Sequence, residues 1–148
     1  MSVVVEIAEA VKAALNAATL SMAFTAERLY VPVYEIRSLS GLKVSVIAAS
    51  SEDERLSRAA SLATHRIDVG VQNRIGTGAM TESEIRAACD PLMDLAEEIA
   101  DLFDGEPLAG YTQAKCTETS MRVLYLPQMI DTHRVFTSVV TLTFQVVG

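Results

Sequence analysis

The stretch HRVFTSVVTLTFQVVG, residues 133–148, carries the most restrictive pattern of this chain. Val140, Leu142, Phe144 and Val146 share one parity, and the positions between them are threonine or glutamine. Because successive side chains of a strand point to opposite faces, the alternation predicts a strand with one buried and one polar face. The edges and the apolar face of such a strand need cover, which predicts a sheet with helices packed on one side.

Two other segments have the spacing of amphipathic helices. Within residues 3–18, Ile7, Val11 and Leu15 recur at every fourth position, and alanines fill most of the gaps. The second segment opens with TESE at residues 81–84. This tetrapeptide fits a capping box, in which the threonine hydroxyl and the last glutamate carboxylate satisfy free backbone amides.

The predicted second helix has an apolar side and an acidic side. Its apolar residues follow one another at steps of three or four: Ile85, Cys89, Leu92, Ala96, Ile99 and Phe103. Its carboxylates fall on the opposite side: Asp90, Asp94, Glu97, Glu98 and Asp101. Pro91 interrupts the pattern, because proline lacks the amide hydrogen that an interior helical position donates. We expect it to kink the helix, or to restart the helix with Asp90 as the N-cap.

Further stretches alternate as strands do. Residues 29–34 and 43–48 flank a glycine turn and predict a hairpin, whose first strand lies at an edge or carries a bulge because of Pro32. A third strand is predicted over residues 65–75 and a fourth over residues 117–125, ahead of the closing strand.

The segment SSEDERLSRAASLAT, residues 50–64, separates the predicted hairpin from the third strand. Its front is charged and rich in serine, and its back has weak helical spacing. The expected order of elements is α-β-β-β-α-β-β. This order predicts an α+β fold with a mainly antiparallel sheet flanked by two main helices, in a single domain over residues 1–148.

Composition narrows the classes of function. The net charge is −7 and aromatic residues make up 5%, which disfavours a nucleic-acid-binding protein. Residues 76–148 carry the whole surplus, with 11 acids against 4 bases. No apolar run approaches the roughly 20 residues that cross a bilayer. Cys89 and Cys116 lie far apart without a CxxC pattern, which favours free thiols in a reducing compartment. Half of the residues are hydrophobic, which favours burial of surface against other subunits.

The sequence contains no pattern typical of an active site. The acids of the second helix lie away from its apolar side. Carboxylates exposed to water there lack the burial or close pairing that acid–base catalysis requires. His65 and His133 each precede a predicted strand, and two histidines without a third ligand make a weak metal site. GTGAM, residues 76–80, lacks the third glycine of GxGxxG and the lysine of a P-loop. We therefore expect no catalytic, cofactor-binding or metal-ligating residues and no cofactor, which leaves an assembly or binding protein.

The arrangement of these segments over most of the chain resembles that of the tail terminator (tail completion) proteins of long-tailed bacteriophages. An alanine-rich helix precedes an extended region, and an acidic helix precedes a final pair of strands. The segments that carry the resemblance are FTAERLYVPVYEI with its Phe24, Arg28, Tyr30 and Pro32, HRIDVGVQNRI, and RVFTSVVTLTFQVV.

The resemblance implies a structural protein and no enzyme. Such proteins form a homo-oligomeric ring, most often of six copies, that caps the tail tube, stops its polymerisation and joins it to the head connector. The implied location is the tail or neck of the virion, after assembly in the host cytoplasm and without membrane contact. The implied partners are the tail tube protein and the head–tail connector or neck protein, and DNA passes through the acidic lumen without specific binding. In such a ring the next subunit can cover strand edges and apolar faces. The closing strand is expected within the sheet, with its apolar face on a helix and its threonine-rich face toward solvent, a neighbour or the lumen.

The charged segment is the expected contact with the tube or the connector, through Glu52, Asp53, Glu54, Arg55 and Arg58. A solvated loop is the alternative interpretation of the same residues. Two other functions fit the chain. One is another ring protein of the neck or of head–tail completion. The other is a small α+β ligand-binding domain or enzyme, which would need a pocket with convergent polar groups.

Overall fold

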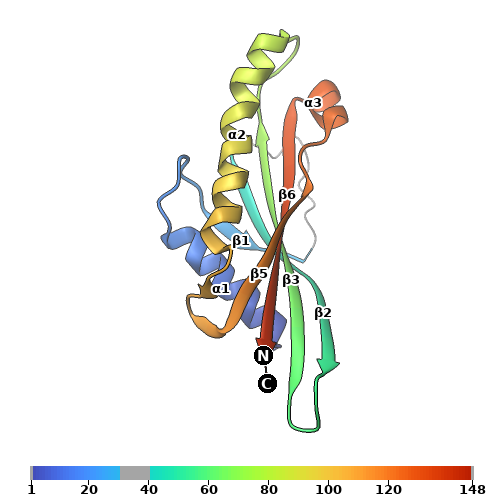
Figure 1. Cartoon of the computed structure of the whole chain (residues 1–148). Coiled ribbons are helices and arrows are strands. Elements are labelled where there is room, and N and C mark those ends of the chain that lie inside the picture. Colours follow the sequence, from blue (N-terminus) through green and yellow to red (C-terminus); the bar gives the residue numbers. More distant parts are fainter. Residues whose placement is uncertain (1, 31–40, 148) are drawn as a thin grey trace.

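The computed structural model describes residues 2–30 and 41–147, which form three helices and six strands (Figure 1). In chain order they are α1 (Val3–Ala17), β1 (Ala26–Arg28), β2 (Lys43–Arg55), β3 (Ser61–Arg74), α2 (Glu82–Phe103), β4 (Pro107–Leu108), β5 (Tyr111–Val123), α3 (Pro127–His133) and β6 (Val135–Val147). The strands form one sheet in the order β1-β2-β3-β6-β5-β4, antiparallel except for the β1–β2 pair. The predicted α+β class with a mainly antiparallel sheet is confirmed, and the order of elements gains the short β4 and α3.

The closing strand, β6, lies inside the sheet between β3 and β5, as predicted. Val140, Leu142 and Phe144 have no exposed surface, so the alternation in the sequence marks the buried face correctly. The Phe144 ring meets the edge of Phe103, at the end of α2, with ring centroids 6.3 Å apart. The apolar face of β6 therefore packs on a helix, and hydrogen bonds to two strands cover both of its edges.

Both long helices contribute to one core with the apolar side chains of the strands. The stripe predicted for α1 is buried at Ile7, Val11 and Leu15. In α2 the stripe is buried from Leu92 onward, and Leu95 joins it without exposed surface. The helices thus shield the sheet face that carries the aliphatic side chains, and the polar parity of the strands lies on the other face.

That other face is polar, but its centre is shielded from water. Asp68 of β3 and Thr143 of β6 are each only 9% exposed. The Thr141 hydroxyl donates to Asp68 Oδ1 at 2.7 Å, and Arg122 Nη2 lies 3.0 Å from Asp68 Oδ2. Partners on two other strands, β6 and β5, therefore satisfy the buried carboxylate, which explains how polar residues line a covered part of the sheet.

The predicted hairpin of residues 29–34 with 43–48 stays a prediction, because residues 31–34 of its first strand lie outside the described residues. β1 ends at Arg28 and runs parallel to β2. The Asn16 side chain, beside the end of α1, donates to Ala26 O at 3.2 Å and accepts from Ala26 N at 2.7 Å. These hydrogen bonds fix the direction in which the chain joins the sheet, and no local sequence pattern records them.

The segment over residues 50–64 is not the separate, weakly helical segment that was predicted. β2 continues to Arg55 and β3 begins at Ser61, so this segment is the distal half of a long antiparallel hairpin with a register shift between Ala48 and Ser50. Its charged residues are exposed on both faces, so apolar alternation cannot appear in the sequence. β5 likewise begins at Tyr111, earlier than predicted.

The capping box at the start of α2 is confirmed. Glu84 N donates to Thr81 Oγ1 at 3.2 Å, and Thr81 N donates to Glu84 Oε1 at 3.1 Å. The predicted restart at Asp90 is wrong, because α2 continues through Pro91. Proline has no amide hydrogen to donate to the carbonyl four residues earlier. Because Pro91 is exposed, water can reach that carbonyl instead. Across residues 2–30 and 41–147, no helix combines the length and the hydrophobicity that a bilayer crossing requires.

Candidate functional site

The most prominent surface feature is the end of the β2–β3 hairpin, here called the hairpin arm (residues 50–64). Figure 1 shows it extending past the other strands at one end of the molecule. β6 accompanies β3 only as far as Leu62, which lies opposite Val147. Beyond that pair only Arg55 and Ser61 are still paired across the hairpin before the turn, so β6 does not cover the end of the arm.

The residues predicted as an interface all lie on the hairpin arm: Glu52, Asp53, Glu54, Arg55 and Arg58. All of them are exposed, and the antiparallel pairing of β2 with β3 brings them to the same end of the molecule. Glu52 Oε1 lies 3.3 Å from Arg66 Nη1 on the neighbouring strand, an exposed pair of small energetic weight.

The turn at the end of the arm, here called the tip (residues 55–60), is held by local hydrogen bonds. Leu56 N and Ser57 N donate to Ala60 O at 3.0 and 3.1 Å, and Ala60 N donates to Ser57 Oγ at 3.1 Å. Between Arg55 and Arg58 the tip presents Leu56, whose surface is 54% exposed. An exposed leucine flanked by guanidinium groups on an ordered turn is suited to contact with another protein.

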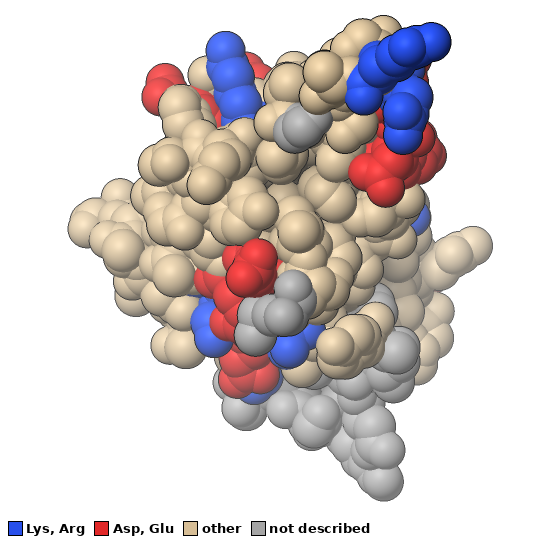
Figure 2. Space-filling model, turned by 90° about the horizontal axis from the view of Figure 1, so that it is seen from below, with Lys and Arg blue, Asp and Glu red and all other residues tan. Residues whose placement is uncertain are grey.

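The molecule seen from the end that carries the arm shows no large field of one charge. In Figure 2, basic and acidic side chains occur in small mixed groups, separated by broad areas of other residues. Such a surface does not match the continuous basic patch that holds a nucleic acid backbone.

His65 was predicted to precede a strand. It lies instead within β3, at the base of the arm. It is 6% exposed, its Nδ1 is hydrogen-bonded to Ser51 Oγ, and its Nε2 has no hydrogen-bond partner among the described residues. Burial lowers the pKa of His65, and the nearby Asp53 acts in the opposite direction. A nucleophilic serine needs a base that a third group orients through its second ring nitrogen, and here that nitrogen lies unpartnered. Among the described residues the pair thus lacks the third group of a catalytic triad.

The acidic side of α2 is a solvent-facing surface, as the helical spacing predicts. Asp90, Asp94, Glu97 and Asp101 are exposed. Glu98 is half-buried and accepts a hydrogen bond from Ser21 N at 3.2 Å, which ties the loop after α1 to α2. These carboxylates give the helix a negative face and not a paired acid–base site.

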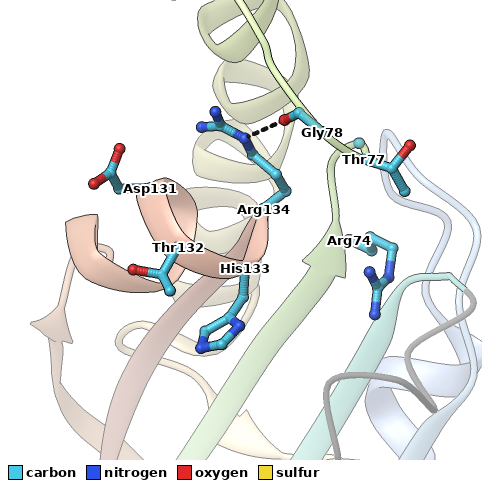
Figure 3. A pocket seen from close by; sticks show the side chains of 8 residues that line it. Arg74, Thr77, Gly78, Asp131, Thr132, His133 and Arg134 are labelled. Atoms are coloured by element: carbon cyan, nitrogen blue, oxygen red, sulfur yellow. Dashed lines mark hydrogen bonds between the residues drawn. The ribbon is translucent and has the colours of Figure 1, made fainter.

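A hollow of about 320 Å³ lies between the GTGAM loop and the end of α3, lined by Arg74, Gly76, Thr77, Gly78, Asp131, Thr132, His133 and Arg134. Figure 3 shows that Arg134 extends toward Gly78, whereas Arg74 and His133 extend in the other direction. Arg134 Nε donates to Gly78 O at 3.0 Å, and Nη1 donates to Ile130 O at 3.2 Å. Arg134 therefore fastens the loop to α3, and the cations do not converge on one ligand position.

Sequence reasoning missed an apolar groove beside the N-terminal half of α2, here called the α2 groove. It has a volume of about 180 Å³ and is lined by Glu82, Ile85, Arg86, Cys89, Asp90, Met93, Tyr125, Ile130 and Phe136. A second hollow adjoins it and shares Glu82, Ile85, Tyr125 and Ile130. The signal in the sequence was the run Leu124-Tyr125-Leu126 after β5, whose side chains are 52%, 47% and 38% exposed. Exposed apolar side chains beside an apolar groove are typical of a protein interface.

Within the described residues, no three His, Cys, Asp or Glu side chains are grouped so that they could hold a metal ion. No protein-family model matches the chain, and a search of curated proteins finds no significant match. The comparisons thus identify no family, and the likeness to tail terminators rests on the arrangement of the segments alone.

Proposed function

We propose that the protein is a structural virion component: a ring, of six copies as the resemblance implies, that caps the tail tube, stops its polymerisation and joins it to the head connector. The hairpin arm is the observation that carries the proposal. It projects beyond the sheet, its charged residues are exposed, and its turn is ordered by hydrogen bonds. These properties suit a contact with another subunit of an assembly.

The chemistry of the described residues supports an assembly role over a catalytic one. The hollow at the GTGAM loop has no converging polar groups (Figure 3), and the Ser51–His65 pair lacks the geometry of an activated nucleophile. The α2 groove combines buried or half-buried apolar residues with the exposed, charged Glu82, Arg86 and Asp90, a combination that suits a protein interface.

The edge of the sheet also favours a closed ring. β1 covers β2 only from Val44 to Val46, with one further hydrogen bond from Leu29 N to Val46 O. Among the described residues no strand pairs with the outer edge of β2 from Ile47 onward. A neighbouring subunit can cover this edge, and in a ring every copy receives the same cover.

The charge distribution suits a passage for DNA. The exposed acids of α2 repel phosphates, so DNA passing such a surface would not adhere to it.

Negative-stain electron microscopy of the purified protein at high concentration tests the ring. Closed rings with a central hole are expected, and they also give the copy number. A compact dimer without a hole would contradict the proposal and favour the small ligand-binding domain instead.

A variant with Arg55→Glu and Arg58→Glu tests the arm. In a mixture with polymerising tail tube protein, wild-type protein should limit tube length, and the double variant should leave tubes unlimited. Lys115→Glu, an exposed charge reversal on β5, is the control and should limit tubes as the wild type does. Normal tube capping by the double variant would remove the arm from the proposed function.

A further inference from the structure

We infer, resting on the ring proposed above, that the tip of one copy seats in the α2 groove of the next copy. The occupant of the groove is thus a second copy of this chain, through Leu56 and its flanking arginines. The arm reaches across to a neighbouring subunit, and each copy offers one tip and one groove.

The shapes of the two surfaces agree with this arrangement. The apolar lining of the groove consists of Ile85, Cys89, Met93, Ile130 and Phe136, all buried or half-buried, together with the exposed Tyr125. The tip offers one large exposed apolar side chain, Leu56, at 54% exposure, followed by the small Ala59 and Ala60. A single leucine on a narrow turn can enter a groove that a flat surface could not fill.

The charges are complementary as well. The tip, from Arg55 to Ala60, contains two arginines and no acid. The charged lining of the groove consists of Glu82 and Asp90 against the single base Arg86, and the adjoining outer face of α2 is acidic. Opposite charges around an apolar contact fix the register of an interface and disfavour the reversed arrangement.

The fold prevents a copy from filling its own groove. Figure 1 shows the arm at one end of the molecule, whereas the N-terminal half of α2 and α3 lie at the other end. A contact between unlike surfaces of successive copies is heterologous, and it closes into a ring when the rotation between copies closes.

The native Cys89 provides a direct test, because it lies in the groove. A Leu56→Cys variant should form an intermolecular disulfide with Cys89 when oxidised with copper phenanthroline. Partial burial raises the pKa of Cys89, as do the nearby Asp90 and Glu82, so the oxidation is run at mildly alkaline pH. Because each copy has one tip and one groove, a non-reducing gel should show a ladder of oligomers that ends at the ring size.

Two control variants make the result specific. Leu56→Cys combined with Cys89→Ala should give no ladder, since Cys116 is buried and its pKa is raised by burial to about 11. Val147→Cys, which places a thiol at an exposed site opposite Leu62 of the arm and outside the tip, should give no Cys89-dependent ladder. Absence of a Cys89-dependent product from Leu56→Cys, with the chain folded by circular dichroism, would overturn the inference.

A charge exchange gives a second readout. Arg55→Glu with Arg58→Glu should reduce self-association in sedimentation velocity, and so should Glu82→Arg with Asp90→Arg. All four changes in one chain should restore it, and failure of the restoration would overturn the inference.

These outcomes separate the inference from the proposed function. If wild-type protein caps tubes but no Cys89-dependent link forms, the tip contacts the tube or the connector and the inference fails alone. If the link forms but tubes are not limited, the proposed function fails and the self-contact stands.

Discussion

Replacing Phe144 by alanine tests whether the centre of the sheet, between β3 and β5, is the main source of stability. Phe144 has no exposed surface, and its ring meets the edge of the Phe103 ring at a centroid distance of 6.3 Å. Truncation removes the ring from the core and leaves a cavity that the flanking hydrogen-bonded strands cannot easily collapse.

The expected loss in the free energy of unfolding is about 3–5 kcal/mol, the range for a buried phenylalanine replaced by alanine. The edge-to-face contact with Phe103 should account for about 0.5–1.5 kcal/mol of this loss. With a urea m-value of about 2 kcal/mol/M, the midpoint of unfolding should fall by about 1.5–2.5 M.

Urea unfolding followed by far-ultraviolet circular dichroism measures this loss, since the chain has no tryptophan to serve as a fluorescent probe. Val147→Ala, at a site that is 68% exposed on the same strand, is the control and should change stability by less than about 0.5 kcal/mol. A double-mutant cycle with Phe103→Ala isolates the ring contact. A loss below about 1 kcal/mol for Phe144→Ala, or a coupling energy near zero in the cycle, would refute this account of the core.

Two further predictions concern the cap of α2 and the buried histidine. Thr81→Ala should lower the free energy of unfolding by about 1 kcal/mol, because its hydroxyl accepts from the amide of Glu84, whereas the exposed Ser83→Ala should have little effect in the same urea assay; equal losses would contradict the capping role. Burial holds the pKa of His65 below 6.5, so the unfolded chain binds more protons than the folded one as the pH falls below 6.5. The stability that this neutral histidine contributes is complete above that pH and is lost as the pH falls through the folded pKa. His65→Leu should therefore flatten the fall in stability below pH 6.5. An unchanged pH profile in His65→Leu would show that other groups cause the fall.

The sequence predicted those parts of the fold in which one face of an element is buried and the other is not. The buried parity of β6 and β3 and the buried stripe of α2 follow from side-chain periodicity, and the structure confirms them at Phe144, Val69 and Ile99. The capping box was equally readable, because its hydrogen bonds join residues three positions apart.

Prediction failed where a long-range contact decides the outcome. The parallel direction of β1 depends on the Asn16 side chain, which holds Ala26 ten residues away. α2 continues through Pro91 because tertiary packing of its buried face outweighs one lost hydrogen bond.

For the candidate site the division is similar. Composition and spacing alone identified the exposed, charged residues Glu52–Arg58 as surface. They did not show that these residues sit on the arm of a β-hairpin, because a strand with two solvated faces has no apolar alternation. Apart from the apolar run Leu124-Tyr125-Leu126, nothing in the sequence indicated the α2 groove. It forms where α2, α3, β6 and the segment after β5 meet, from residues up to 54 positions apart, Glu82 and Phe136 among them. Periodicity reports which side of an element is buried, and only the tertiary structure decides which of these elements meet and what surface they leave open between them.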